Sequence, residues 1–268
     1  MLAAVMIGST VFSLTACRGT DQAAGGVSAG TQDGTATLQN QGTDSNTDNA
    51  VVLAQDTRAL QIIDDNYRTY YELFVYSFYD SDGDGIGDLQ GVLEKLDYLN
   101  DGDDTTDTDL GINGIWLMPV MPSTTYHKYD TTDYENIDAQ YGTLETFQEL
   151  LTACHDRGIR VILDLAMNHS SSSHPWFQQA AEYLKSLPEG AEPDSSECPY
   201  VDYYHFSREY QGGYAQLDGT AWYYEARFWD GMPDLNLENE AVRREFEQIA
   251  DFWLDMGVDG FRLDAVKE

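Results

Sequence analysis

Residues 260–268, Gly-Phe-Arg-Leu-Asp-Ala-Val-Lys-Glu, have the pattern of a short strand that ends in charged side chains. Apolar residues at 261 and 263 alternate with Arg262 and Asp264, and a period of two is typical of a strand. Alternate strand residues point to one face, so the guanidinium and the carboxylate are expected side by side. A neighbouring positive charge keeps a carboxylate ionised. This stretch alone leaves two interpretations open, a nucleophilic Asp264 or a structural Arg–Asp pair.

Strand and helix patterns alternate through the chain that precedes this stretch. Near-continuous apolar strands separated by helices are typical of a parallel sheet that helices cover. Four such units predict an α/β fold, the first half of a TIM-type (β/α)8 barrel, whose active residues lie at the carboxyl ends of the strands. An irregular insertion, residues 170–232, follows the third strand. The predicted strands are 72–78, 112–118, 159–165 and 257–264, and the predicted helices are 88–100, 143–157 and 238–256.

The charge of the chain excludes several classes of partner. Among 268 residues, 47 are Asp or Glu and 14 are Lys or Arg, which gives a net charge of -33. Nucleic acid would be repelled by this charge, and so would a membrane surface that needs a basic patch. We therefore expect a soluble domain outside the cytoplasm that acts on a neutral substrate.

The first residues have the features of an export signal. Residues 1–16 are apolar and too few to span a bilayer as an ordinary helix. Leu14-Thr15-Ala16-Cys17 resembles the bacterial lipobox, in which the cysteine receives lipid; the alternative is an ordinary signal peptide with a chance cysteine. We expect residues 1–17 to be a signal peptide and 18–57 a disordered linker, because the latter lack large apolar residues. The predicted location is extracytoplasmic, either lipid-anchored at the cell membrane or secreted. The anchor would be the only membrane contact.

The two remaining cysteines, Cys154 and Cys198, carry little information about pairing. An oxidising compartment would permit a disulfide between them, but two cysteines alone are weak support for one. The sequence leaves open whether they pair.

An acidic loop follows the first predicted strand. Residues 80–88 read Asp-Ser-Asp-Gly-Asp-Gly-Ile-Gly-Asp, which matches the first half of a calcium loop. The twelfth position is Gly91 instead of a bidentate Glu, so the loop is not an EF-hand. The alternative is a solvated acidic turn, but carboxylates this close repel each other unless a cation is present. The predicted Ca²⁺ ligands are the side chains of Asp80, Asp82, Asp84 and Asp88 and the carbonyl of Ile86.

Three more polar clusters lie near the predicted strand ends, at 126–134, 164–169 and 232–236. With 260–268 they occur in the order of the conserved regions of the alpha-amylase family, glycoside hydrolase family 13. The chain resembles that family from about residue 70 to its end. The resemblance implies barrel segments at 58–169 and 233–268, and an insertion similar to the family's domain B at 170–232.

The resemblance also implies a role for each matching residue. Asp264 would be the nucleophile that forms a glycosyl-enzyme intermediate, and Arg262 would keep it ionised and oriented. Asn168 would be structural or a second calcium ligand, and Asp164 would orient the segment that carries Asn168 and His169. The implied substrate-binding residues are Tyr129, which stacks on the sugar, Asp130 and His169, which hydrogen-bond it, and Lys267, where Glu268 replaces a His common in the family.

The family's acid/base Glu follows the fifth strand, so it is expected beyond this chain. Retaining glycosidases need two carboxyl groups, and Glu225 and Glu268 do not lie at a fifth strand end. We therefore expect an amino-terminal fragment, inactive alone, of a hydrolase that cuts α-glucosidic bonds in starch-like glycans. Two alternatives stay open: an inactive surface glycan-binding module, and a transglycosylase or trehalose-forming relative. Linkage specificity and oligomeric state are not set by the sequence.

Overall fold

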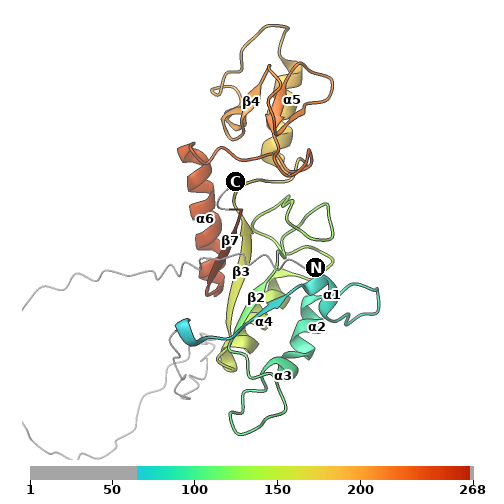
Figure 1. Ribbon diagram of the computed structural model, residues 1–268, viewed down its shortest axis with the longest axis vertical. Helices are drawn as coiled ribbons and strands as arrows, with labels where there is room; N and C mark the ends of the chain where they lie inside the picture. The colour runs from blue at the N-terminus through green and yellow to red at the C-terminus, as the bar shows by residue number, and fades with distance from the viewer. Residues whose placement is uncertain (1–64, 266–268) are drawn as a thin grey trace, which may run out of the picture. The chain divides into compact units, whose positions relative to one another are not determined.

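The computed structural model describes residues 65–265 (Figure 1). The predictions for the signal peptide, Cys17, the linker and Lys267 lie outside these residues. Within them, no helix is both long and apolar enough to cross a membrane. The helices are η1 Asp65–Tyr67, α1 Val75–Phe78, α2 Leu89–Glu94, α3 Leu96–Leu99, α4 Leu144–Asp156, α5 Pro175–Ser186, η2 Pro199–Asp202 and α6 Glu240–Met256. The strands are β1 Tyr70–Leu73, β2 Gly114–Leu117, β3 Arg160–Ala166, β4 Phe206–Ser207, β5 Tyr214–Gln216, β6 Tyr223–Glu225 and β7 Gly260–Asp264.

Four strands form a parallel sheet in the order β1-β2-β3-β7, which is also their order along the chain. Parallel neighbours joined by helical crossovers are the arrangement of a βα barrel. Ile115, Leu117 and Leu163 are at most 1% exposed, as expected for strands covered by helices. The predicted fold class is confirmed: the sheet is part of a (β/α)8 barrel.

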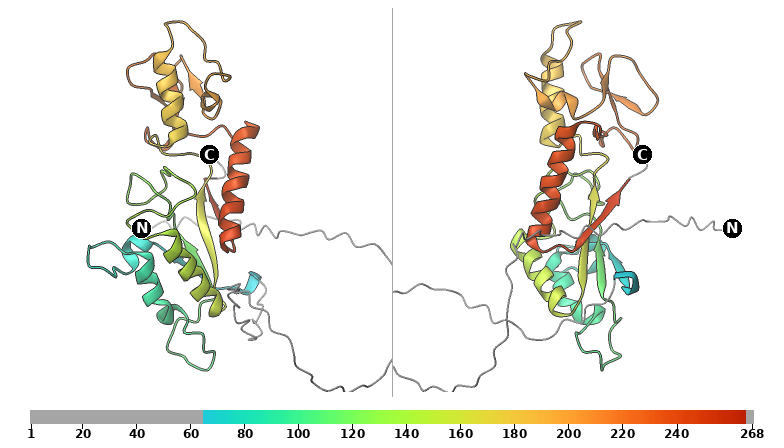
Figure 2. Two further views of the ribbon diagram at one scale, coloured as in Figure 1. Left: turned by 180° about the vertical axis from the view of Figure 1, so that it is seen from behind. Right: turned by 90° about the vertical axis from the view of Figure 1, so that its left-hand side faces the viewer.

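Helices cover one face of this sheet (Figure 2). Thr143 caps α4 by accepting from the Thr146 backbone N–H at 3.3 Å, and Asn239 caps α6 by accepting from Ala241 at 2.9 Å. Gly257, with φ of +113°, ends α6 in the left-handed conformation that suits glycine. The buried residues of α6 recur at helical spacing on the face turned to the core. They are Val242, Phe246, Ile249 and Trp253.

The predicted first strand is wrong over residues 74–78, where the chain turns into α1. Its partner β2 ends at Leu117, two residues before Pro119, so no ladder remains for a longer β1 to join. The backbone carbonyls of Tyr76 and Tyr79 instead accept from Gly87 and Asp88 at 2.8 and 3.1 Å. These bonds fix the acidic loop against the carboxyl end of β1.

The segment predicted to be irregular, residues 170–232, contains regular structure. It forms α5 and a three-stranded antiparallel sheet in the order β4-β6-β5, and it lies beyond the carboxyl ends of β3 and β7 (Figure 1). Phe177 of α5 packs on Tyr204 and Tyr224 with ring centroids 5.2 and 4.8 Å apart. The strands are two or three residues long, which is too short for a period to show in the sequence.

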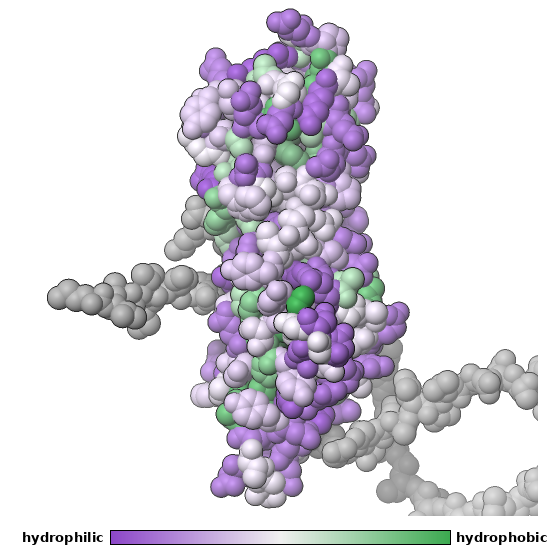
Figure 3. Space-filling model, turned by 90° about the vertical axis from the view of Figure 1, so that its right-hand side faces the viewer, coloured by the Kyte–Doolittle hydropathy of each residue, from purple (hydrophilic) through white to green (hydrophobic). Residues whose placement is uncertain are grey.

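The surface and the cysteines complete the description. Hydrophilic side chains dominate the face seen in Figure 3, in keeping with the excess of acidic residues. Cys154, on α4, and Cys198, before η2, are both buried and free. They do not form the disulfide that the sequence left open.

Candidate active site

The register of the parallel sheet brings charged side chains together at its carboxyl end. Asp164 of β3 is paired with Arg262 of β7, and Ala166 is paired with Asp264. Registered residues of parallel strands, and residues two apart, share a face of the sheet. Arg262 Nη1 accordingly donates to Asp264 Oδ1 and to both oxygens of Asp164. The guanidinium therefore joins two carboxylates from neighbouring strands.

Asp164 lies at the centre of this cluster, with no exposed side-chain area. Arg262 Nη1 lies 3.0 and 3.2 Å from its two oxygens, and Oδ2 also accepts from Tyr129 Oη at 2.9 Å and Trp116 Nε1 at 3.2 Å. Burial raises the pKa of Asp164 to about 6, although the Arg262 charge acts in the opposite direction. Asp164 was expected to orient the segment with Asn168 and His169. That role stays a prediction, and the contacts of the Asp164 side chain are with Arg262, Tyr129 and Trp116.

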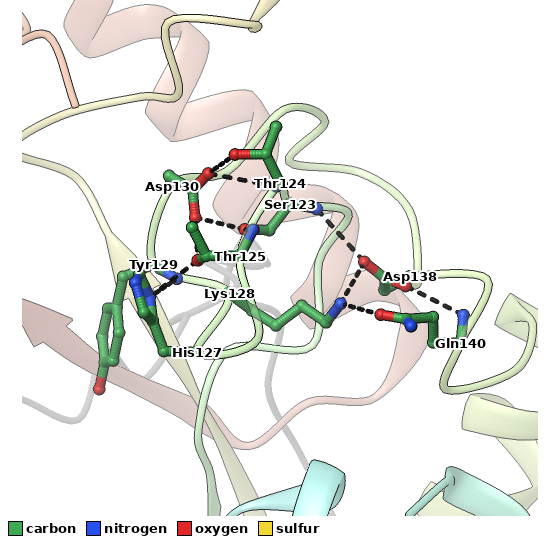
Figure 4. Close-up of polar contacts among 9 residues, drawn as sticks. All are labelled: Ser123, Thr124, Thr125, His127, Lys128, Tyr129, Asp130, Asp138 and Gln140. Atoms are coloured by element: carbon green, nitrogen blue, oxygen red, sulfur yellow. Dashed lines mark hydrogen bonds and ion pairs between the residues drawn. The ribbon is translucent and has the colours of Figure 1, made fainter. Parts of the chain in front are cut away.

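Tyr129 reaches the site from the loop between β2 and α4. Burial, with the nearby charge of Asp164, raises the pKa of its phenol, so the hydroxyl stays protonated and donates. Figure 4 shows its ring on one side of the loop, while Lys128 extends to the other side toward Asp138. Lys128 Nζ lies 2.7 Å from Asp138 Oδ2 and 2.8 Å from Gln140 Oε1, and the lysine is 1% exposed. This buried ion pair fixes the loop that presents Tyr129.

Asp130 makes its contacts within its own loop, and its role in sugar binding stays a prediction. Its side chain points into the loop, where it accepts from Ser123 Oγ at 2.5 Å, from Thr124 N–H at 3.1 Å and from the hydroxyls of Thr124 and Thr125 (Figure 4). Burial alone would raise its pKa, but these hydrogen bonds outweigh burial and hold the pKa below the usual value. Asp130 is 0% exposed. These contacts fix the loop that carries Tyr129.

His169 follows β3 and is 1% exposed. Neither ring nitrogen has a hydrogen-bond partner in the described part of the chain, which is costly for buried polar atoms. Burial lowers the pKa of the imidazole, and the negative charge of Asp264 acts in the opposite direction, so the two side chains lie close enough to interact. The ring of Phe228 meets it edge to face, with centroids 5.0 Å apart. A neutral imidazole with free nitrogens suits binding to hydroxyl groups.

Asn168 and Asp234 hold this segment in place. Asn168 Nδ2 donates to Asp234 Oδ1 at 2.7 Å, and the backbone N–H of Arg227 donates to Asp234 Oδ2 at 2.9 Å. Burial raises the pKa of Asp234, and these hydrogen bonds act against that rise. An isolated bridge also pairs His169 with Asp234 in the backbone. Asn168 thus joins the end of β3 to Asp234, and its two expected roles, structural residue or calcium ligand, both stay predictions.

The acidic loop brings three of its four aspartates together. One oxygen from each of Asp80, Asp82 and Asp88 lies within 4.8 Å of the others. Asp84 Oδ1 accepts from the Ile86 N–H at 2.7 Å, so its carboxylate folds back on the loop. An all-oxygen donor set suits a hard cation such as Ca²⁺. The residues fit the predicted metal, with Asp84 outside the group of converging carboxylates.

A cavity of about 400 Å³ lies apart from these clusters, between residues 132–135, the start of α5 and one side of α6. None of the residues predicted for catalysis, sugar binding or metal binding lines it. The candidate site is therefore the group of side chains at the carboxyl ends of β2, β3 and β7, and not this cavity.

Sequence reasoning did not identify Trp116 and Phe228 as part of the site. Trp116 lies inside an apolar strand, where its period-two position marks its face but not its partners. Phe228 sits in the insertion, four residues before the Met232 motif. Its closeness in sequence to that motif was the only feature that could have indicated a place for Phe228 in the site.

An Asp, an Arg and an imidazole lie at the carboxyl end of this parallel sheet, which is where βα barrels carry their active sites. The family model described as alpha amylase, catalytic domain, matches residues 72–268. The chain belongs to the alpha-amylase family.

Relatives and solved structures place the chain within that family. It is 46% identical over 204 residues to alpha-amylase 3 of Dictyoglomus thermophilum, an alignment that covers 74% of this chain and 36% of that protein. It is 38% identical over 210 residues to an oligo-1,6-glucosidase of Parageobacillus thermoglucosidasius, covering 73% and 34%. The solved structure of Eubacterium rectale Amy13B is 65% identical with a TM-score of 0.72, covering 76% and 38%. The chain thus spans about a third of the length of these curated relatives.

Proposed function

We propose that the protein carrying this chain is a retaining glycoside hydrolase of the alpha-amylase type, which hydrolyses α-glucosidic bonds in starch-like glycans or maltooligosaccharides. One observation carries the proposal: Arg262 Nη1 joins Asp264 to the buried Asp164, while the unpartnered imidazole of His169 lies within charge range of Asp264. Membership of the family supports it independently.

In the proposed reaction, an oxygen of Asp264 attacks the anomeric carbon of the sugar. The bond from that carbon to the leaving oxygen breaks, and the leaving oxygen takes a proton from a second carboxyl group. Water then attacks the same carbon and gives its proton to that second group, which releases Asp264 as a carboxylate. Two inversions at one carbon leave the α configuration unchanged.

The second carboxyl group is proposed to come from residues beyond 268. Glu225 is not a good candidate, because it pairs with Arg227 at 2.8 Å in β6 of the insertion. Residues 1–268 alone are accordingly proposed to be inactive.

The other side chains bind and orient the sugar in this proposal. Arg262 holds Asp264 in position through the charged hydrogen bond between its Nη1 and the carboxylate. Tyr129 offers its ring as a stacking surface, and neutral His169 hydrogen-bonds the hydroxyls of the same sugar. Lys267 is proposed to contact the sugar on the leaving-group side.

The proposal is tested on the complete protein with maltooligosaccharides as substrate. Proton NMR during the first minutes of the reaction should show the α-anomer of the new reducing end, which later equilibrates with the β-anomer. Initial release of the β-anomer would contradict a covalent intermediate on Asp264. Absence of any turnover would favour the inactive glycan-binding alternative.

A second candidate function is transfer of the sugar to another sugar instead of to water, because both reactions share the intermediate on Asp264. It is separated from hydrolysis by adding a large excess of glucose as acceptor. New disaccharides at the expense of hydrolysis would favour transfer. Similarity to an oligo-1,6-glucosidase makes isomaltose the substrate to compare with maltose.

We further propose that residues 80–88 bind a structural Ca²⁺ and that Cys17 carries a lipid anchor outside the cytoplasm. The converging oxygens of Asp80, Asp82 and Asp88 support the first, and the sequence of residues 14–17 supports the second. The cation would supply positive charge that holds three carboxylates together, without a part in the reaction.

A further inference from the structure

Trp116 occupies the interior face of the sheet, directly beneath the proposed catalytic cluster. Its neighbours on β2, Ile115 and Leu117, are 1% and 0% exposed, and alternation along a strand turns Trp116 to the opposite face. It is in register with Ile162, which is two residues before Asp164 on β3. Trp116 and Asp164 therefore share one face of the sheet.

The indole contacts both members of the pair that positions Asp264. Its Nε1 donates to Asp164 Oδ2 at 3.2 Å, and its ring lies 5.2 Å from the Arg262 guanidinium carbon. The first contact supplies a donor to a carboxylate that has no exposed area, and the second is within the range of a cation–π interaction. One side chain thus restrains Asp164 from below and covers the guanidinium.

We propose that Trp116 is a positioning residue for the glycosidase reaction, which fixes Arg262 against Asp264 through its contacts with Asp164 and with the guanidinium. The inference rests on the proposed function of the site. Trp116 contacts Asp164 and Arg262, so the proposed effect of Trp116 is on the position of the nucleophile. Loss of the contact should lower kcat more than it changes KM, because it disturbs the transition state more than ground-state binding.

The kinetic test compares Trp116→Phe, which keeps a ring and loses the N–H donor, with Trp116→Leu, which loses both contacts. In the complete protein, Trp116→Phe should lower kcat on the order of tenfold, the expected cost of one hydrogen bond to a charged group, with KM within about twofold. Trp116→Leu should lower kcat further, because both contacts are lost. The acid limb of the kcat profile should move to higher pH in both, since Asp164 loses a donor that favours its charged form.

The matched control is Trp222→Phe. Trp222 lies in the insertion, is 7% exposed and also covers a guanidinium, that of Arg208, at 4.4 Å. This variant should keep the kcat and the acid limb of the wild type. A Trp116→Phe enzyme with wild-type kcat and an unmoved acid limb would overturn the proposal. So would equal losses in the two Phe variants, because a general loss of packing would then explain them.

A measurement on the wild type needs neither turnover nor a stable variant. The indole N–H proton of Trp116 should shift in the NMR spectrum with a midpoint near pH 6, where Asp164 titrates. A resonance that stays constant over the whole pH range in which a carboxyl group can titrate would overturn the contact itself. This titration does not depend on substrate. A wild type that hydrolyses no α-glucoside would therefore refute the proposed function, whereas the NMR result would still test the contact between Trp116 and Asp164.

Discussion

Arg262 and Asp164 face each other across β7 and β3, with Nη1 3.0 Å from Oδ1 and 3.2 Å from Oδ2. The two residues are paired in the register of the sheet, so the contact follows from the strand alignment and not from a flexible loop. Asp164 is fully buried, and burial raises its pKa to about 6 even with the guanidinium beside it. Asp164 therefore titrates close to the working range of many enzymes.

The raised pKa of Asp164 predicts a specific pH dependence of stability. Its pKa in the folded state, about 6, exceeds the ordinary Asp value of 3.8, so between these values the folded state holds more protons than the unfolded state. Stability from this group is fully present below about pH 4 and is lost as pH rises through 6. The free energy of unfolding in urea should fall for the wild type relative to Asp164→Asn as pH rises from 4 to 7.5, because Asn does not titrate. If the free energies of unfolding of the wild type and Asp164→Asn changed in parallel with pH, the raised pKa would be contradicted. The control is Asp251→Asn, at an exposed position on α6, which should change in parallel with the wild type.

The proposed nucleophile gives a second prediction. Asp264→Ala should lower the hydrolysis of maltooligosaccharides by the complete protein at least ~10³-fold, because the covalent route is lost. With α-glucosyl fluoride and added azide, the azide should enter from the vacated side and give β-glucosyl azide while fluoride leaves. Formation of α-glucosyl azide, or activity near that of the wild type, would exclude Asp264 as the nucleophile.

Local sequence patterns predicted the parts of the site that lie on one strand. Arg262 and Asp264 are two residues apart, so a period of two was enough to place them together. The contact between Arg262 and Asp164 joins residues 98 positions apart and depends on strand register, which the pattern did not give. The same holds for Trp116 and Asp164, which are 48 positions apart.

The hydrogen-bond partners of Asp130 could not be predicted from the motif alone. Asp130 sits next to Tyr129, and the motif does not give the hydrogen-bond partners of either side chain. In the structure, the Tyr129 hydroxyl donates to Asp164. The Asp130 carboxylate accepts from the hydroxyls of Ser123, Thr124 and Thr125. Three small hydroxyl residues before a Tyr-Asp pair would have been the signal, because such residues readily bond a nearby carboxylate.

His169 gives the third prediction. Its ring nitrogens have no partner in residues 65–265, and a lowered pKa keeps the ring neutral at pH 7, so it can bond sugar hydroxyls. His169→Asn should lower kcat/KM on the order of 10²-fold, the usual cost of one transition-state donor. Differential scanning calorimetry should show a melting temperature close to that of the wild type.

His174 provides the control for that variant. It is also buried, with a pKa that burial lowers to about 4, but its ring accepts from the Trp176 N–H as the cap of α5. Asn is a good capping residue, so His174→Asn should keep both the fold and kcat/KM. Equal losses of activity in the two variants would mean that His169 acts through packing alone.

The lipid anchor gives the fourth prediction, which concerns residues outside the described part of the chain. In a bacterial host, the wild-type protein should partition into the detergent phase of a Triton X-114 extraction and incorporate labelled palmitate. Cys17→Ala should abolish both, because the thiol that receives the lipid is gone. A wild-type protein found only in the aqueous phase would reject the anchor and leave an ordinary signal peptide.

The calcium loop gives the last prediction, and the chain supplies its own control. Ca²⁺ that binds only the folded state should stabilise it by about 2.7 kcal/mol at a concentration 100 times the dissociation constant, so excess EDTA should lower the melting temperature by several degrees. Asp82→Asn removes one of three converging carboxylates and should abolish most of this difference. Asp103→Asn changes another exposed acidic loop, in which Asp103 accepts from the N–H and the hydroxyl of Thr105, and should keep the calcium effect. A melting temperature that EDTA leaves unchanged would show that the carboxylates of residues 80–88 are held by the backbone N–H groups of Gly83 and Gly85 and by Ser81, without a cation.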